Sequence, residues 1–216
     1  MADRRTFLAA VTTLTGATLL EPLSRSADAL AQEAVLHDGP WDLAWVKTLR
    51  GRHRQVFDTG TVEDALRIVA NYLDAFETIL GMKFPDVNVI VGIAGRAFPI
   101  NASDALWQKY QLGKGWNVTD PETKIPAVRN IFETGGATPQ EQKYRVRALQ
   151  ARGAIFWQCN NALHTVSERL APDAGVPPET VYQDLRAGLL TGVRLIPAHT
   201  MLLSLVQEQG CAYQRL

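Results

Sequence analysis

The chain has 216 residues, with 22 lysines and arginines against 22 aspartates and glutamates, so its formal net charge is zero. Charges of both signs are interspersed, which argues against nucleic acid or an anionic membrane surface as a partner. The two cysteines, Cys159 and Cys211, are too few for a disulfide scaffold, and no cysteine–histidine cluster has the spacing of a zinc site. We therefore expect no metal and no resident cofactor, and the sequence leaves open whether the two cysteines pair.

Residues 1–31 have the layout of a secretory signal. Arg4 and Arg5 stand directly before Thr-Phe-Leu, an uncharged apolar stretch follows over 9–20, and small residues precede an expected cleavage after Ala29 or Ala31. The paired arginines match the twin-arginine pattern, which predicts export of the folded protein to the periplasm. The apolar stretch is shorter than the ~20 residues that span a bilayer. A cytosolic amphipathic helix is the alternative; it explains the alanines but not the Arg-Arg-Thr-Phe-Leu order.

The mature chain, residues 32–216, has the length of a single domain with one substantial core, and no later segment is expected to span a membrane. Its first half predicts a strand, a helix and a strand over residues 54–57, 62–80 and 87–93. Thr59 or Thr61 is the expected helix cap, and Gly81 ends the helix. The second strand is almost wholly apolar, so we expect it to be buried on both faces. Gly92, near the end of this strand, and Gly95, just beyond it, are assigned to a tight strand-to-loop turn.

A long irregular connection occupies the middle of the chain. After a short helix over 101–110, residues 113–138 show no strong periodicity, and a connection of this length is expected to be a functional or interface loop. The remaining elements follow in the order helix, strand, helix, helix, strand, helix over residues 139–151, 154–157, 160–170, 179–190, 193–197 and 198–209. A chain break is expected over 172–178, and 211–216 is either a tail or an edge strand.

Alternating strands and helices predict an α/β fold: a three-layer parallel sheet with helices on both faces. Ligands of such sheets bind beyond the carboxyl ends of the strands. Three segments are expected at these carboxyl ends: 92–96, 158–160 and 196–199. Gly95, Cys159 and His199 are therefore expected to lie together along this rim of the sheet.

Cys159 follows a strand and precedes a helix, and this junction is the most chemically suggestive place in the sequence. Helix amino termini carry partial positive charge and unpaired N–H groups, both of which favour a thiolate over a thiol. Cys159 is therefore a candidate nucleophile. A small buried apolar residue is an equally open interpretation.

Other residues at the same rim are candidates for ligand binding. His199 could carry a proton for the thiol, ligate a metal or haem, or simply cap a helix. Arg96 could hold an anion or be a solvated surface residue, and Gly95 and Asn160 lie beside these positions. Three aromatic residues could line a pocket or belong to the core: Trp107, Tyr110 and Trp116.

Three places in the sequence together resemble the DsrE/DsrF-like family over roughly residues 52–216. They are Asn88-Val-Ile-Val-Gly92 followed by Gly95, Cys159-Asn-Asn-Ala-Leu163, and the closing Gly192-Val-Arg-Leu-Ile-Pro197 with Gln207-Glu-Gln-Gly210-Cys-Ala-Tyr213. The resemblance implies a compact flavodoxin-like fold, assembly into trimers or hexamers, and sulfur relayed as a persulfide on a cysteine at the position of Cys159. The chain departs from the family in its export signal and in the extra segment 107–130.

Two functional hypotheses lead. In the first, an exported sulfur carrier handles sulfur or thiol redox chemistry through Cys159, as a persulfide or mixed disulfide. In the second, a non-catalytic periplasmic homo-oligomer binds a small molecule or a haem-like group. A structural subunit with a merely buried cysteine is a third. The sequence contains no Gly-x-Ser-x-Gly, P-loop or His-Glu-x-x-His motif.

Overall fold

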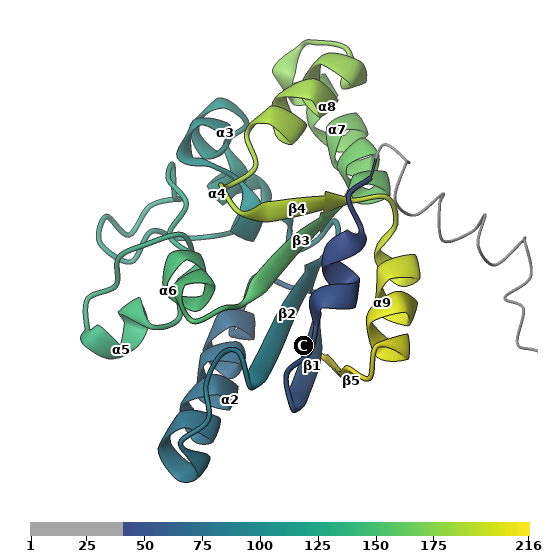
Figure 1. Cartoon of the computed structure of the whole chain (residues 1–216). Helices are drawn as coiled ribbons and strands as arrows, with labels where there is room; N and C mark the ends of the chain where they lie inside the picture. The colour runs from purple at the N-terminus through teal and green to yellow at the C-terminus, as the bar shows by residue number, and fades with distance from the viewer. Residues whose placement is uncertain (1–40) are drawn as a thin grey trace, which may run out of the picture. The chain divides into compact units, whose positions relative to one another are not determined.

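The computed structural model of the protein describes residues 41–216, so the expected signal at 1–31 lies outside the described residues. Five parallel strands form one sheet in the order β4-β3-β2-β1-β5, as Figure 1 shows. The strands are β1 (His53–Thr59), β2 (Val87–Ile93), β3 (Ile155–Cys159), β4 (Val193–Ile196) and β5 (Ala212–Arg215). The predicted parallel α/β sheet is confirmed.

The order of the strands differs in one place from the 2-1-3-4-5 order of flavodoxin. Here the strand outside β1 is the last of the chain, β5, which pairs with β1 through Gln55 opposite Ala212 and Asp58 opposite Arg215. The closing residues are therefore an edge strand. This pairing brings the end of the chain beside the carboxyl end of β1.

The helices and 3-10 helices fill the connections between these strands. Their bounds are η1 (Ala44–Thr48), α2 (Ala65–Leu80), η2 (Phe98–Asn101), α3 (Asp104–Lys109), α4 (Leu112–Gly115), α5 (Pro139–Gln142), α6 (Val146–Ala151), α7 (Asn160–Ala174), α8 (Pro178–Ala187) and α9 (His199–Glu208).

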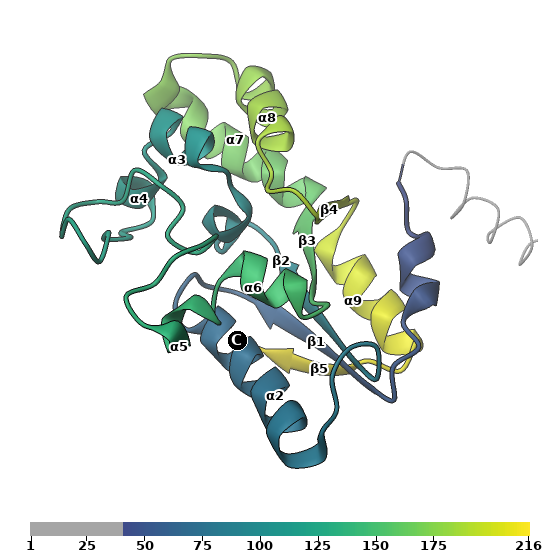
Figure 2. The same cartoon turned by 60° about the vertical axis from the view of Figure 1, so that its left-hand side comes forward.

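Alternate side chains of each strand enter different apolar clusters. Phe57, Val91 and Phe156 pack against α2 and α6 on one face of the sheet. Val56 and Trp157 pack against η1 and α9 on the other. Figure 2 shows the sheet between these two layers of helix. The period of two in the strands thus produces the predicted three layers.

A third cluster lies among α3, α4, α7 and α8. Trp107 of α3 is fully buried there, with Leu163 of α7 and Leu185 of α8. The Trp107 indole N–H donates to the Pro99 carbonyl oxygen at 3.0 Å. Of the two interpretations of this tryptophan, core packing is the one the structure supports.

The start of α2 was predicted wrongly. The helix begins at Ala65 rather than Val62, and its N-cap is Asp64, not Thr59 or Thr61. Asp64 has a φ of 52°, so the chain makes a left-handed step immediately before the helix. The predicted end is confirmed, since Gly81 caps the helix with a φ of 65°, a conformation that glycine adopts without strain.

The helix expected over 139–151 is broken into α5 and α6. Thr138 and Glu141 form a capping box at the start of α5. Arg145 is extended, and the amide N–H groups of Val146 and Arg147 donate to the carbonyl oxygens of Phe132 and Glu133. The connecting loop therefore takes backbone hydrogen bonds that a continuous helix would have made. The break expected at Pro172 also comes later, because α7 continues to Ala174 and ends at Gly175.

No helix within residues 41–216 is both long and apolar enough to cross a membrane. Over the same residues, no three or more histidine, cysteine, aspartate or glutamate side chains are grouped in a way that could hold a metal ion.

Candidate functional site

Cys159 lies at the amino ends of two helices. It is the last residue of β3 and the N-cap of α7. Its Sγ atom also accepts the backbone N–H of His199, the first residue of α9, at 3.3 Å. Figure 1 shows β3 running into α7 while the chain after β4 turns into α9. The amino ends of both helices, which carry partial positive charge, therefore meet at this sulfur.

The sulfur is nevertheless well covered. Cys159 is only 4% exposed and belongs to the apolar cluster under η1 and α9, together with Trp45 and Trp157. The sequence left a reactive thiol and a buried apolar residue as alternatives. The structure combines features of both, because the position is buried and is also at the start of two helices.

Cys211 has a different environment. Burial raises its pKa to about 11, with only partial relief from the charge of Arg54, so this thiol stays protonated at neutral pH. Cys211 directly precedes β5, whose first residue, Ala212, lies opposite Gln55 near the amino end of β1. Cys159, in contrast, is at the carboxyl end of β3. Both cysteines are free.

A glycine makes room for an indole that crosses the sheet. Asp58, Gly92 and Trp157 are neighbours in one row across β1, β2 and β3. A Cβ atom on Gly92 would stand 2.6 Å from Cζ2 of Trp157, closer than such atoms can approach. Gly92 is thus an interior residue of β2, within the predicted limits of that strand. It gives room to the indole, and the turn expected of it is not what it forms.

Trp157 and Asp58 hold His199 from both sides of its ring. The indole Nε1–H of Trp157 donates to Nδ1 of His199 at 3.0 Å. Because an indole nitrogen can only donate, Nδ1 must accept, and the ring proton lies on Nε2, where it donates to Oδ1 of Asp58 at 2.8 Å. Both ring nitrogens are therefore occupied. The backbone of His199, and not its imidazole, is what contacts the thiol.

Asp58 accepts hydrogen bonds from three side chains, which belong to two elements, α9 and β5. Besides His199 it accepts from the Tyr213 hydroxyl at 2.8 Å and from Nη1 of Arg215 at 3.1 Å, both on β5. The side chain is only 8% exposed, and burying a carboxylate without partners would be costly. Here both oxygens are satisfied. The hydrogen-bonded group Asp58, Trp157, His199, Tyr213 and Arg215 is called the Asp58 network below.

Sequence reasoning found His199 but missed the rest of the Asp58 network. Asp58 is an acidic residue that directly follows the apolar pair Val56-Phe57 near the carboxyl end of β1. This pattern could have identified it as a residue at the carboxyl ends of the strands. Trp157 was taken only as part of an apolar run. Tyr213 and Arg215 could not be placed, because the pairing of β5 with β1 joins residues far apart in the sequence.

The other predicted site residues have contacts of their own. The side chain of Asn160 is bonded to the Tyr182 hydroxyl, which donates to its Oδ1 at 2.7 Å. Arg96 is exposed, and its carbonyl oxygen accepts the Trp116 indole N–H at 2.7 Å. Gly95 follows β2, and a Cβ on it would meet Ala162 and Val166 of α7 at 3.9 Å.

Comparisons with known proteins do not identify a family. No family model matches the chain, and no curated protein matches it. Among solved structures, that of the protein of unknown function MTH1491 from Methanobacterium thermoautotrophicum is similar over 76% of this chain and 99% of that one, with 16% identity and a TM-score of 0.38.

Proposed function

We propose that the protein is an exported, DsrE-like sulfur carrier that takes a single sulfur atom on Cys159 as a persulfide. The observation that carries the proposal is the place of the Cys159 sulfur at the start of both α7 and α9, with the amide of His199 donating to it. The same amide and the two helix ends would stabilise the anionic terminal sulfur of a persulfide.

The proposed loading step conserves atoms and electrons. The Cys159 thiolate attacks the outer sulfur of thiosulfate and forms a new S–S bond. The bond between that sulfur and the sulfonate group breaks, and sulfite leaves with the bonding electron pair. The products are cysteine persulfide and sulfite, and the thiol proton has already passed to solvent.

Burial of the thiol narrows the choice of sulfur chemistry. Because Cys159 is only 4% exposed and belongs to an apolar cluster, a small inorganic donor needs far less opening than a protein partner. A persulfide is therefore favoured over a mixed disulfide with a bulky thiol. The neutral thiol of Cys211 makes a poor competitor, because burial raises its pKa to about 11.

Sulfite release tests the proposal. The mature protein is mixed with excess thiosulfate, and sulfite is measured alongside the variants Cys159→Ala and Cys211→Ala. We expect close to one sulfite for each chain from the native protein and from Cys211→Ala, and none above background from Cys159→Ala. Equal release from Cys159→Ala would overturn the proposal.

Ligand binding remains the second candidate, in a form without haem. A haem iron bound to His199 would have to displace either Trp157 from Nδ1 or Asp58 from Nε2. The geometry therefore gives no support to His199 as an axial ligand. A small-molecule site is favoured instead by a cavity on the other face of the sheet, between the start of α2 and the central loop.

Export to the periplasm by the twin-arginine route is part of the same proposal. The order Arg4-Arg5-Thr6-Phe7-Leu8 supports the twin-arginine route. A reporter fused after residue 31 should reach the periplasm, and changing both arginines to lysine should hold it in the cytoplasm; unchanged export of the lysine variant contradicts this. The family resemblance supports a homo-trimer or hexamer, which light scattering of the mature protein tests directly.

A further inference from the structure

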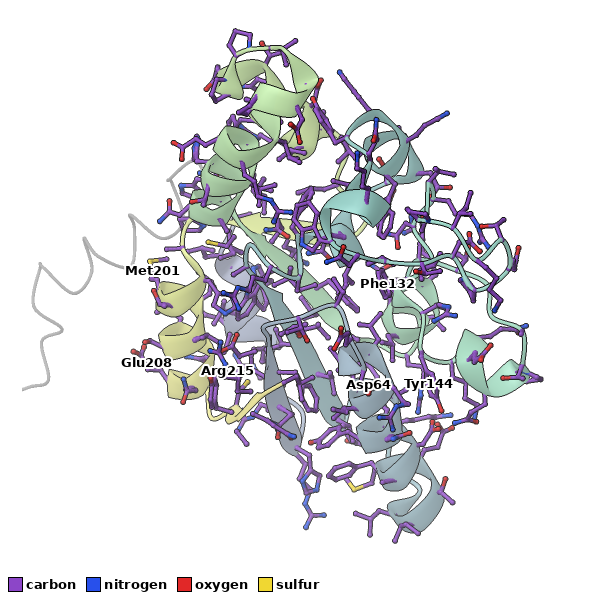
Figure 3. All side chains as sticks on the ribbon, turned by 180° about the vertical axis from the view of Figure 1, so that it is seen from behind. Asp64, Phe132, Tyr144, Met201, Glu208 and Arg215 are labelled. Carbon is purple, nitrogen blue, oxygen red and sulfur yellow. The ribbon has the colours of Figure 1, made fainter. Side chains whose placement is uncertain are left out.

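A cavity of about 380 Å³ lies between the start of α2 and the long central loop. Its wall includes Asp64, the N-cap of α2, Leu66 from that helix, and Phe132 from the loop. Tyr144 and Arg145 come from the segment that joins α5 to α6. Figure 3 shows Asp64, Phe132 and Tyr144 in this part of the molecule, away from α9. The cavity thus lies on the α2 face of the sheet, whereas the Cys159 sulfur packs on the α9 face.

Two of the arginines in the wall already have carboxylate partners. Arg67 is bonded to Asp64 at 3.0 Å. Arg129 is bonded to Asp120 at 2.9 Å and to Glu122 at 3.0 Å. These cations are neutralised by the protein, so neither of them calls for an anion from outside.

Arg145 is the exception. Its Nε donates to the carbonyl oxygen of Gly135 at 3.1 Å, and no carboxylate among residues 41–216 forms an ion pair with it. Burial and the charge of Arg129 both lower its pKa, against the attraction of Glu141. The guanidinium is thus half-buried with charges of both signs nearby, and only its Nε–H donates to a protein group among residues 41–216.

Glu141 does not neutralise Arg145 by direct contact. Its Oε2 accepts the amide N–H groups of Ala137 and Thr138, at 2.6 and 3.3 Å, as part of the capping box of α5. Holding the carboxylate on these amides keeps it from closing onto the guanidinium. A carboxylate-sized anion beside Arg145 would therefore satisfy a charge that the wall leaves without an ion pair.

The rest of the wall is suited to an apolar group. Val62, Ile131 and Phe132 line the same cavity and are half-buried. A ligand with an anionic end and an apolar body would cover these side chains while it pairs with the guanidinium. The cavity also lies beyond the carboxyl end of β1, which is where parallel sheets bind ligands.

We propose that this cavity binds a small organic carboxylate, whose carboxylate group pairs with Arg145 and whose apolar body packs on Phe132. The long connection that the sequence marked as functional then has a defined role, because residues 121–137 form one wall of the site. The proposal is independent of sulfur chemistry at Cys159.

Binding of benzoate, with the uncharged benzamide as a matched probe, tests the inference by titration calorimetry or NMR on the mature protein. We expect saturable benzoate binding that benzamide does not reproduce. Arg145→Gln should weaken it at least ~10-fold, as expected for loss of a charge-assisted contact. Arg147→Gln removes a nearby arginine that is outside the cavity wall and is already paired with Glu133, and should change the affinity less than ~2-fold.

Two results would overturn the proposal: equal binding of benzoate and benzamide, or equal effects of the two arginine substitutions. Absence of saturable benzoate binding by the native protein would overturn it as well. If Arg145→Gln does not fold, Arg145→Lys keeps the charge but loses the planar fork, and should bind more weakly than native protein. Cys159→Ala should bind benzoate normally, so failure here and failure of the sulfur proposal are distinguishable.

Discussion

Asp58 shows how one buried carboxylate can organise the rim of the sheet. It is bonded to His199, Tyr213 and Arg215, and through His199 it is connected to Trp157. His199 in turn presents its backbone N–H to the Cys159 sulfur. At the scale of single residues, the geometry around the thiol therefore depends on a side chain from the first strand and two from the last.

Replacing Asp58 by asparagine should destabilise the protein by about 1–3 kcal/mol, because an amide offers a single acceptor oxygen to three converging donors and leaves at least one of them unpaired. The free energy of unfolding from urea titrations measures this. Tyr213→Phe is the matched control, since it removes one of the three bonds and should cost about 1 kcal/mol. An Asp58→Asn variant as stable as the native protein would contradict the importance given to this carboxylate.

Cys211 should make stability fall at alkaline pH. Its pKa is raised by burial from 9.0 to about 11 in the folded state, so the unfolded chain loses this proton first. The stabilisation is fully present below pH 9 and is lost as the pH rises towards 11, by up to roughly 3 kcal/mol.

Unfolding titrations between pH 8 and 11 measure the effect of this thiol. The Cys211→Val variant removes the ionisable group while keeping an apolar side chain, and should show a smaller decline over that range. A decline of the same size in both proteins would show that another group is responsible. Tyr213 contributes in the same direction at higher pH, because its bond to Asp58 raises its pKa.

At the scale of elements, Gly92 of β2 has no side chain, and this leaves the space that Trp157 of β3 occupies. The indole of Trp157 lies over this position and reaches His199. The sequence predicted both strands, and β2 with its observed limits, because a run of β-branched apolar residues is a strong local signal. It could not predict the role of Gly92, because the contact involves a residue in the neighbouring strand.

Substituting Gly92 by alanine should lower the free energy of unfolding by about 1–3 kcal/mol, since the new Cβ would force Trp157 out of its place. The near-ultraviolet circular dichroism of the tryptophans should change with it. Gly95→Ala is the control: its Cβ would have only ordinary contacts at 3.9 Å, so both stability and spectrum should stay close to native. Similar behaviour of the two variants would argue against the close approach.

The break between α5 and α6 was also beyond the sequence. Residues 139–151 are compatible with one helix, yet the carbonyl oxygens of Phe132 and Glu133 take the amides of Val146 and Arg147. Tertiary hydrogen bonds outweigh local propensity here. The same break places Arg145 in the wall of the cavity, which is why that residue was not among the predicted site residues.

For the whole molecule, alternation of strands and helices was sufficient to predict a parallel sheet with helices on both faces, and to place Cys159 and His199 at the same rim. The position of β5 beside β1 was not predictable, because a short edge strand carries little pattern of its own; all four of its residues are exposed. That pairing supplies Tyr213 and Arg215 to the Asp58 network. The unpredicted part of the candidate site therefore traces largely to one long-range strand pairing.

The most direct test of the sulfur proposal is to locate the added sulfur within the chain. Mature protein treated with thiosulfate in its native state is alkylated, digested and mapped by mass spectrometry. We predict that the peptide containing Cys159 gains the mass of one sulfur atom, while the peptide containing Cys211 stays unmodified. An unmodified Cys159, or equal labelling of both cysteines, would contradict the account.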